Sequence, residues 1–286
     1  MKAAVLLVCV LGLLMVVQAD ENITAVKYHK RVGIPAAARI KLQESSMRIA
    51  GGFGSFTGEH PFMAGLLVTL NTGQTSVCGG ALVGRYHVVT IAQCWYDGES
   101  QGRSIEVVLG TVKLFYGGTR TYATTVTLHP YYSPYTLAYD IAMIRVPYVS
   151  YTSNISPIIL PSSYFSTLEG YSAEIIGYGR TSPTGPLDLS SSLRDVFVTV
   201  ISNAQCQLIY GNIVNSDMMC TSGDYGKGAC GGDYGGPLIL RRFSGASGQD
   251  MLVGLVSFTG SAGCNAGFPT GHTRITSYLS WINYFL

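Results

Sequence analysis

The sequence predicts an all-β protein of the barrel or sandwich type that is closed by one C-terminal helix. The composition is 47% hydrophobic and 12% charged, with 35 glycines and 19 tyrosines, which is typical of strands joined by tight turns. From Ile49 onward, short apolar stretches alternate with turns rich in Gly, Ser, Asn and Pro. The C-terminal residues instead repeat apolar side chains at helical spacing.

The predicted strands fall into two groups that divide near Pro161. The first group comprises residues 62–70, 87–92, 104–110, 121–128 and 141–146, and the second comprises 172–179, 195–201, 237–243 and 251–258. A helix is predicted over 275–286, where the i, i+3, i+4, i+7, i+11 positions are Ile275, Tyr278, Leu279, Ile282 and Leu286. We therefore expect a first barrel over about 49–160, a second over about 161–274, and a closing helix.

The N-terminus has the layout of a secretory signal peptide over residues 1–19. Lys2 precedes an apolar run from Ala3 to Val17, and the small residue Ala19 suits cleavage. The alternative is a membrane anchor, but a membrane span needs roughly 20 apolar residues and this run is shorter. The sequence therefore predicts a secreted protein without a membrane segment.

Residues 20–48 are interpreted as a removable pro-segment. They are polar, contain no cysteine, and end in QESSMR just before IAGG. A glycosylation sequon begins at Asn22, and a second begins at Asn154, where the following Pro157 weakens it.

Six cysteines remain once the signal peptide is removed with Cys9: Cys78, Cys94, Cys206, Cys220, Cys230 and Cys264. An even number in an exported chain favours three disulfides, although the residues alone leave 15 possible pairings. A zinc site is the alternative, but neither a Cys-x-x-Cys pair nor a histidine at ligand spacing accompanies these cysteines. We expect no metal and no cofactor.

Charge excludes one class of partner. Beyond residue 48 the chain carries 11 basic and 13 acidic residues, so nothing predicts a nucleic-acid partner.

Four short motifs occur in a fixed order along the chain. They are RIAGG at 48–52, TIAQC at 90–94, DIAMI at 140–144 and CGGDYGGP at 230–237. Together they resemble the activation junction and the histidine, aspartate and serine motifs of the chymotrypsin-like serine proteases. Details such as CGGALV from Cys78 look closest to gut chymotrypsins of insects, especially Lepidoptera.

This resemblance implies a trypsin-like fold over residues 49–286, with two six-stranded antiparallel barrels and the C-terminal helix. It also implies the disulfide pairs Cys78–Cys94, Cys206–Cys220 and Cys230–Cys264.

The resemblance further implies that the catalytic triad is incomplete. Asp140 is retained, and Ser257 matches the serine that supports it. Gln93 occupies the histidine position, and a carboxamide does not take up a proton in the working pH range. Tyr234 occupies the serine position, where a phenol with a pKa near 10 stays protonated. No other histidine falls at the site by motif order, and His87 is interpreted as structural or at the surface.

Other features of the serine motif match the family. The amides of Gly232 and Tyr234 would form the oxyanion hole if the loop keeps its shape, although the tyrosine ring would project towards the scissile carbonyl. Cleavage between Arg48 and Ile49 would free an ammonium group that pairs with Asp233.

The specificity pocket is expected to be shallow, as in elastases. Gly228 stands where trypsins carry aspartate, and Thr259 and Thr270 replace glycines of the pocket wall. Any residual binding should favour small apolar side chains.

The sequence favours a secreted, monomeric serine protease homologue that is not catalytic and acts by binding, in a regulatory, decoy or gut-lumen role. Its partners would be an unknown protein, such as a protease or an inhibitor, and the activating protease that cleaves at Arg48. Gut lumen is favoured over haemolymph. Because the Tyr234 ring should occupy the space that an inhibitor loop needs, we favour a partner surface outside the cleft; a phenol pointing to Gln93 and filling the cleft would support this.

Two alternatives remain open. One is a weakly active digestive endopeptidase of altered chymotrypsin-like or elastase-like specificity. The other is a gut-lining protein that binds polysaccharide, which only the tyrosines of LHPYYSPYTLAY, residues 128–139, support.

Overall fold

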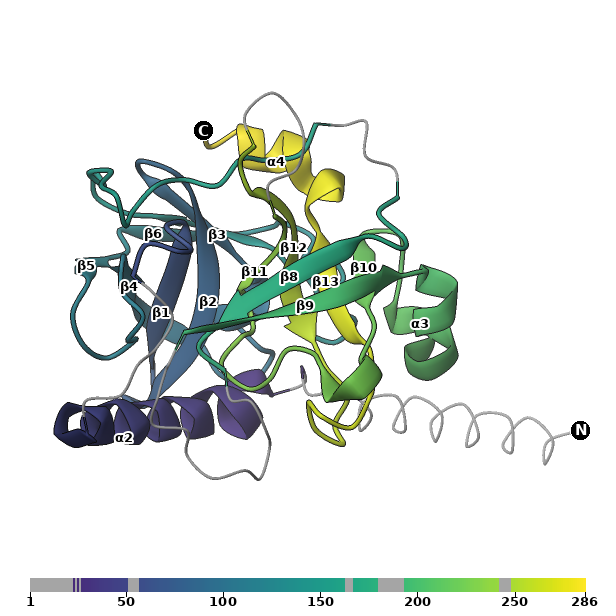
Figure 1. Ribbon diagram of the computed structural model, residues 1–286, viewed down its shortest axis with the longest axis horizontal. Helices are drawn as coiled ribbons and strands as arrows, with labels where there is room; N and C mark the ends of the chain where they lie inside the picture. Colours follow the sequence, from purple (N-terminus) through teal and green to yellow (C-terminus); the bar gives the residue numbers. More distant parts are fainter. Residues whose placement is uncertain are drawn as a thin grey trace, which may run out of the picture.

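The computed structural model describes residues 23, 25, 27–50, 57–162, 167–179, 193–241 and 248–286, and for 46–50 it describes the backbone alone. The predicted signal peptide and the sequon at Asn22 lie outside the described residues. Two β-barrels stand side by side, and an N-terminal helix runs beneath the first of them (Figure 1).

The first barrel is formed by a seven-stranded antiparallel sheet, one strand more than expected, with the strand order β5-β4-β1-β2-β3-β7-β6. Its strands are β1 (Met63–Leu70), β2 (Thr75–Gly84), β3 (His87–Thr90), β4 (Gly102–Leu109), β5 (Thr119–Tyr122), β6 (Thr125–Leu128) and β7 (Ala142–Arg145). The single strand predicted over 121–128 is two strands, because the chain turns at Ala123 and Thr124. β5 pairs with β4 and β6 pairs with β7, so this bent segment brings the two edges of the sheet together.

The second barrel is closed, with the order β10-β13-β12-β11-β8-β9. Its strands are β8 (Ser172–Gly177), β9 (Arg194–Ile201), β10 (Met218–Thr221), β11 (Pro237–Leu240), β12 (Met251–Phe258) and β13 (Thr270–Arg274). β2, β10 and β13 were not predicted from the sequence. β13 reads TGHTR and has no apolar alternation, yet all its residues but Arg274 are buried, so neighbouring strands impose its conformation.

The remaining helices are short. α3 (Asn203–Tyr210) begins at Ser202, whose side chain and that of Gln205 form a reciprocal capping box. Single 3-10 turns cover Ala92–Cys94, Gly211–Ile213 and Asp224–Gly226. The predicted C-terminal helix is a 3-10 turn (Ile275–Tyr278) followed by α4 (Leu279–Asn283), so it ends earlier than the pattern indicated.

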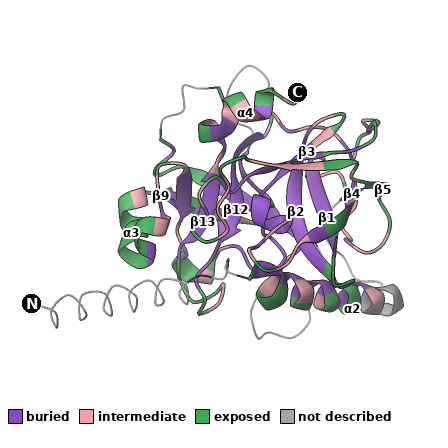
Figure 2. Cartoon of the chain, turned by 180° about the vertical axis from the view of Figure 1, so that it is seen from behind, coloured by how far each residue is buried: buried purple, intermediate pink, exposed green. Residues whose placement is uncertain are grey.

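The predicted pro-segment forms an ordered part of the structure. A π-helical turn (His29–Gly33) leads directly into α2 (Ile34–Ala50), which packs against β2. Tyr28, Ala36 and Ile40 are buried in the same apolar core as the barrel strands. Along α2, buried residues alternate with exposed ones, and the helix lies beneath strands that are largely buried (Figure 2).

Three disulfides connect the cysteines in the pairs that the family resemblance implies. Cys78–Cys94 joins β2 to the turn after β3, Cys206–Cys220 ties α3 to β10, and Cys230–Cys264 links two loops of the second barrel. No helix among the described residues is both long and apolar enough to cross a membrane.

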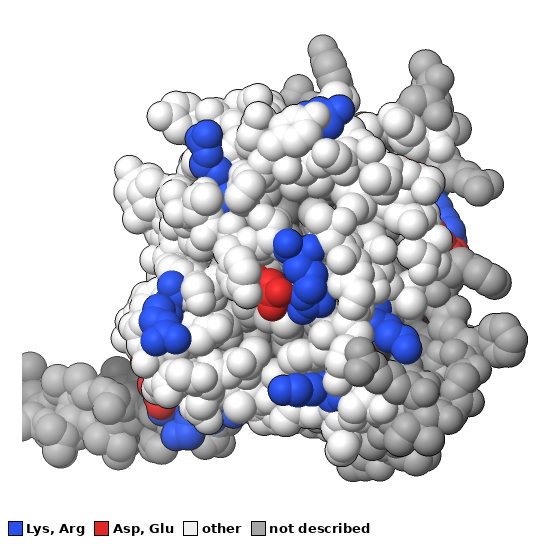
Figure 3. Space-filling view, turned by 90° about the vertical axis from the view of Figure 1, so that its left-hand side faces the viewer, with Lys and Arg blue, Asp and Glu red and all other residues white. Residues whose placement is uncertain are grey.

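Charged side chains are sparse on the face shown in Figure 3. Lysines and arginines are scattered over that face, some of them beside an acidic side chain, and do not form one continuous basic patch.

Candidate active site

The two barrels bring Gln93, Asp140 and Ser257 together in a buried hydrogen-bonded group. Gln93 lies in the 3-10 turn that follows β3, Asp140 lies just before β7, and Ser257 lies near the end of β12. Gln93 Nε2 donates to Asp140 Oδ2 (2.7 Å) and to the Ser257 carbonyl oxygen (2.8 Å). The Gln93 backbone amide donates to Asp140 Oδ1 at 3.0 Å, and Ser257 Oγ donates to Asp140 Oδ2 at 2.8 Å. Both oxygens of the carboxylate are thus occupied.

Burial controls the protonation of Asp140, which is 1% exposed. Loss of solvent raises the pKa of its carboxyl to about 6, while the hydrogen bonds from Gln93, Ser257 and Ala92 act in the opposite direction. The amide of Gln93 therefore stabilises the ionised form of a carboxylate that would otherwise be costly to bury. Gln93 Oε1 is buried and has no hydrogen-bond partner among the described residues. The carboxamide therefore meets the hydrogen-bonding needs of Asp140 while its own oxygen stays without a partner there.

Tyr234 is the largest side chain of the serine motif and is 1% exposed. Its hydroxyl lies 3.0 Å from Thr259 Oγ1 and accepts a hydrogen bond from the Thr259 backbone amide at 3.1 Å. Burial raises the pKa of the phenol, and the two contacts with Thr259 reduce that rise. Neither a threonine hydroxyl nor a backbone amide accepts a proton at neutral pH, so these contacts do not activate the phenol.

The phenol extends from the serine motif to Thr259, one of the predicted pocket residues. The Tyr234 hydroxyl does not point to Gln93, as an arrangement expected from the sequence would require; it contacts Thr259 instead. The side-chain amide of Gln93 is bonded to Asp140 and to the Ser257 carbonyl. The Tyr234 ring packs on the ring of Tyr28, with centroids 4.7 Å apart and planes inclined by 30°. The ring of Tyr234 from the serine motif and the ring of Tyr28 from the pro-segment therefore lie together at the serine position.

The loop around Tyr234 contains two glycines, Gly232 and Gly235, at which any other side chain would force neighbouring atoms to shift. Gly232 has φ of 114°, and a Cβ added there would lie 3.0 Å from Gly179 Cα. Gly235 has φ of 79°, and a Cβ there would lie 2.5 Å from the Gly79 carbonyl oxygen. This close approach lets the Gly79 amide donate to the Tyr234 carbonyl at 2.7 Å.

Asp233 lies under the loop with its carboxylate held by backbone amides. Gly179 N donates to Oδ1 at 2.6 Å, and Cys230 N donates to Oδ2 at 2.8 Å. Burial raises the pKa of this carboxyl to about 6, opposed by the two amides and by the positive charge of Arg39.

The predicted activation junction lies in a helix. Arg48 and Ile49 belong to the last turn of α2, and Ile49 is joined to Arg48 by a peptide bond, so it offers no ammonium group to Asp233. In this uncut chain the positive charge near Asp233 comes from Arg39, whose Nη2 donates to the Gly231 carbonyl at 3.0 Å.

Two of the three predicted pocket residues, Gly228 and Thr270, lie close to each other. A Cβ added to Gly228 would lie 3.0 Å from Thr270 Oγ1, which accepts from the Ala229 amide at 3.2 Å. Thr259 lines a cavity of about 260 Å³. Its wall is shared between the loops of the second barrel and the pro-segment, which contributes Arg31, Val32, Pro35 and Ala36.

Residues 49–282 match the model of the Trypsin family. The chain belongs to the trypsin family. It is 35% identical to a collagenase of Hypoderma lineatum, over 82% of this chain and 86% of the relative. It is 34% identical to brachyurin of Leptuca pugilator, over 82% and 96% respectively. The solved structure of HL collagenase superposes with a TM-score of 0.72 at 33% identity and covers 82% of this chain and 96% of that chain.

These relatives make the chain a trypsin-family protein of the chymotrypsin-like serine protease type, with the trypsin fold. Three residues were not predicted: Tyr28 and Arg39, which lie at the site, and Glu44, which binds the amides of Leu114 and Phe115. All lie in the N-terminal segment that precedes the family match. The signals available were weak: an aromatic pair in YHK at 28–30, and one glutamate in an otherwise uncharged QESS stretch.

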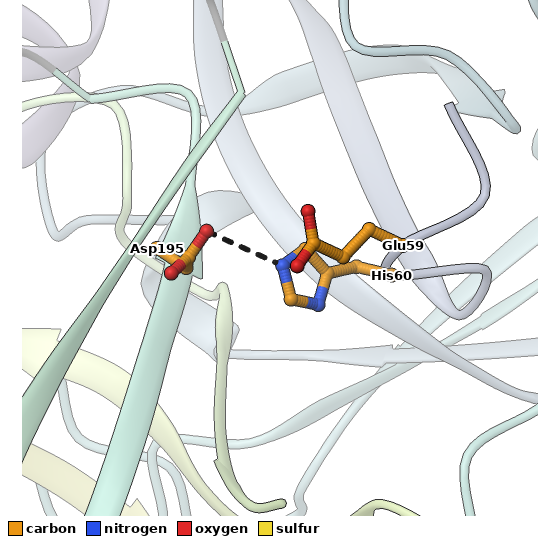
Figure 4. Close-up of side chains that lie close together, drawn as sticks. All are labelled: Glu59, His60 and Asp195. Atoms are coloured by element: carbon orange, nitrogen blue, oxygen red, sulfur yellow. Dashed lines mark ion pairs between the residues drawn. The ribbon is translucent and has the colours of Figure 1, made fainter. Parts of the chain in front are cut away.

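A second group of ionisable residues, of which His60 and Glu174 are buried, joins the barrels. His60 Nε2 lies 3.5 Å from Asp195 Oδ1, and Glu59 approaches the same point, so ligand atoms of all three lie within 4.8 Å of one another (Figure 4). Arg241 pairs with Glu59 at 2.9 Å and with Glu174 at 3.3 Å. A divalent cation would have to share this space with the guanidinium group. We therefore interpret the group as a charge-paired contact between the barrels.

The tyrosines after β6 divide into two sets. Tyr131 and Tyr135 are 73% and 72% exposed, whereas Tyr139 stacks on His129 with centroids 4.7 Å apart. His129 also contacts Tyr278 and Trp281 at the C-terminus, so this part of the stretch is packing. His87 is the first residue of β3 and pairs with Arg145 of β7. It therefore lies at the opposite end of β3 from Gln93, which follows the last residue of the strand.

Proposed function

We propose that this trypsin-family protein is a secreted, non-catalytic homologue that acts by binding. One observation carries the proposal: the Gln93 carboxamide is bonded to Asp140, and the Tyr234 phenol is bonded to Thr259 instead of standing free beside a base. Three disulfides agree with an oxidising, extracellular environment.

The chemistry of acyl transfer explains why these two positions matter. The reaction needs a hydroxyl nucleophile and a base that removes its proton. Gln93 cannot accept a proton near neutral pH, and burial makes Tyr234 harder to ionise than a free phenol. Loss of nucleophile and base together lowers turnover by about six orders of magnitude in serine proteases, because the groups act as a unit.

The alternative function is weak proteolysis of altered specificity. Its support is the retained hydrogen bonding of Asp140 and the names of the relatives, which are a collagenase, brachyurin and a chymotrypsin-like elastase from Bos taurus. Thr259 and Thr270 would then line a shallow pocket for small apolar side chains, as the sequence predicted.

The test compares the wild-type chain with the revertant Gln93→His plus Tyr234→Ser. Both are cut after Arg48 and offered a panel of peptide esters and amides between pH 7 and 11. We expect hydrolysis by the revertant and none by the wild type above background. Turnover by the wild type within tenfold of the revertant would overturn the proposal.

A matched control separates restored chemistry from contamination. Adding Asp140→Asn to the revertant removes the carboxylate that orients the histidine, which should lower its rate by about 10⁴-fold. If the revertant is inactive as well, the single variants Gln93→His and Tyr234→Ser show by circular dichroism whether either change disturbs the fold.

The binding partner is expected to be a protein met in the gut lumen. Affinity capture from the native fluid, with the chain cut after Arg48 as bait, distinguishes an inhibitor, a protease and a polysaccharide. An exposed face is the more suitable contact surface, since the buried rings of Tyr234 and Tyr28 pack on each other at the serine position.

A further inference from the structure

The N-terminal segment occupies the cleft of this protein as a ligand would. Ile23 forms an antiparallel bridge with Gly260, just beyond Thr259 of the pocket wall. Tyr28 is fully buried, packs on Tyr234, and donates its hydroxyl hydrogen to the Val77 carbonyl at 2.6 Å. Val32 lies close to Gly231, where an added Cβ would come within 3.0 Å of Val32 Cγ1. The segment therefore spans both barrels across the serine motif.

Polar contacts fix the segment at both ends. The His29 backbone amide donates to Asp97 Oδ2 at 2.8 Å, and His29 Nδ1 lies 2.8 Å from Ser76 Oγ. Glu44 is fully buried, and its two carboxylate oxygens accept from the amides of Leu114 (2.5 Å) and Phe115 (2.7 Å). Charge-assisted hydrogen bonds of this kind are roughly twice as strong as neutral ones.

All of these anchors precede the predicted cut. Glu44 is the last of them, and the junction between Arg48 and Ile49 lies beyond it. Cleavage there breaks one peptide bond, and none of the contacts of residues 23–44 described above involves that bond. The segment contains no cysteine, so only noncovalent contacts can hold it after the cut.

We propose that residues 23–44 are a built-in ligand of the cleft that stays bound after cleavage between Arg48 and Ile49. The cut protein is then a noncovalent two-chain complex in which Tyr28 covers Tyr234. This inference does not depend on whether the chain is catalytic. A retained segment would, however, also cover position 234 of the revertant, because Tyr28 packs on that position. The hydrolysis test is therefore run with Tyr28→Ala in both chains, so that its failure and the failure of the test below are distinguishable.

Most of the binding energy should come from Tyr28 and the carboxylate of Glu44. Removal of a buried aromatic side chain costs several kcal/mol, which corresponds to at least 100-fold weaker retention of the segment. Loss of one carboxylate charge from the two amide contacts should weaken retention by about tenfold or more.

The experiment uses the full chain with a unique cleavage site. Ser45→Ile, Ser46→Glu and Met47→Gly place Ile-Glu-Gly-Arg before Ile49, leave Glu44 and Arg48 unchanged, and let factor Xa cut at the junction. Met47→Gly also weakens the last turn of α2, which must unwind to enter a protease. Native mass spectrometry and gel filtration at 10, 1 and about 0.1 µM then measure whether the two chains remain together.

We expect the cut chains to co-elute in a 1:1 ratio at about 1 µM, which corresponds to a sub-micromolar Kd. In the same background, Tyr28→Ala should release the segment, and Tyr28→Phe should keep most of it because the ring contact remains. Lys41→Ala is the matched control, since Lys41 is exposed on α2, and should change nothing. Separate elution of the cut segment at 10 µM, or equal retention with Tyr28→Ala, would refute the proposal.

A second measurement needs no cleavage. In the uncut chain, Glu44→Gln should speed hydrogen exchange at the amides of Leu114 and Phe115 by at least about tenfold, because their charged acceptor is lost. Unchanged exchange at both amides would show that Glu44 does not anchor the segment.

Discussion

The hydrogen bonds between Gln93 and Asp140 lead to a quantitative prediction for Gln93→Met. Methionine has nearly the volume of glutamine but no donor, so Asp140 loses the contact at 2.7 Å and the Ser257 carbonyl loses the one at 2.8 Å. The backbone donor of Gln93 and the hydroxyl of Ser257 remain. The change therefore removes two hydrogen bonds at one point and opens little space.

The size of the effect follows from the pKa of Asp140, about 6. At pH 8 the wild-type carboxyl is ionised, and protonating it costs about 3 kcal/mol, since one pKa unit corresponds to about 1.4 kcal/mol. The variant can avoid a poorly solvated charge by taking up this proton, so that cost sets an upper limit on the charge-dependent loss. The neutral bond to Ser257 adds about 1 kcal/mol at every pH.

The pH dependence follows from the raised pKa. The Asp140 pKa lies above its value in the unfolded chain, so the carboxyl contributes stability at low pH that is lost as the pH rises through the folded pKa. Gln93→Met raises that pKa further and extends the loss to higher pH. We expect the variant to be less stable by about 1 kcal/mol at pH 5 and by about 3 to 4 kcal/mol at pH 8.

The assay is urea unfolding followed by tryptophan fluorescence at pH 5, 6, 7 and 8 with the uncut chain. Gln93→His is the comparison variant, because a histidine can donate to Asp140 and should restore most of the loss. An equal loss of stability at pH 5 and at pH 8 would refute the reasoning, since Asp140 would then not titrate in this range.

Three further predictions test other parts of the site. Asp233→Asn should remove a fall in stability of about 3 kcal/mol between pH 4 and 6, because the raised pKa of about 6 makes wild-type stability decline as the pH rises there; identical pH profiles would contradict this. Gly79→Ala should cost about 2 kcal/mol or more in urea unfolding, because the new Cβ would lie 2.7 Å from Gly236 Cα, whereas Ser104→Ala on the exposed side of β4 should be neutral. Replacing both Cys206 and Cys220 by alanine should cost about 3 kcal/mol, as expected for a loop of 14 residues, and a loss below 1 kcal/mol would count against that estimate.

The sequence alone determined the features that depend on short motifs, on the order of those motifs along the chain, and on local apolar patterns. The motifs around Gln93, Asp140 and Tyr234 predicted which residues meet at the site, because their family resemblance fixes their place in the fold. The strands of the two barrels were largely found from alternating apolar stretches, and β13 was missed because its TGHTR pattern is polar, although its neighbours bury it.

Only the tertiary structure decided where the phenol and the N-terminal segment go. The direction of Tyr234 depends on Thr259, which is far away in sequence and reaches it because β12 ends beside the loop. Tyr28 and Glu44 are buried through contacts with β2 and with the loop after β4, and a polar segment gives no local sign of such partners. Long-range packing is the physical reason: a side chain's burial is set by the surfaces that the fold brings to it, and the sequence around that residue does not contain them.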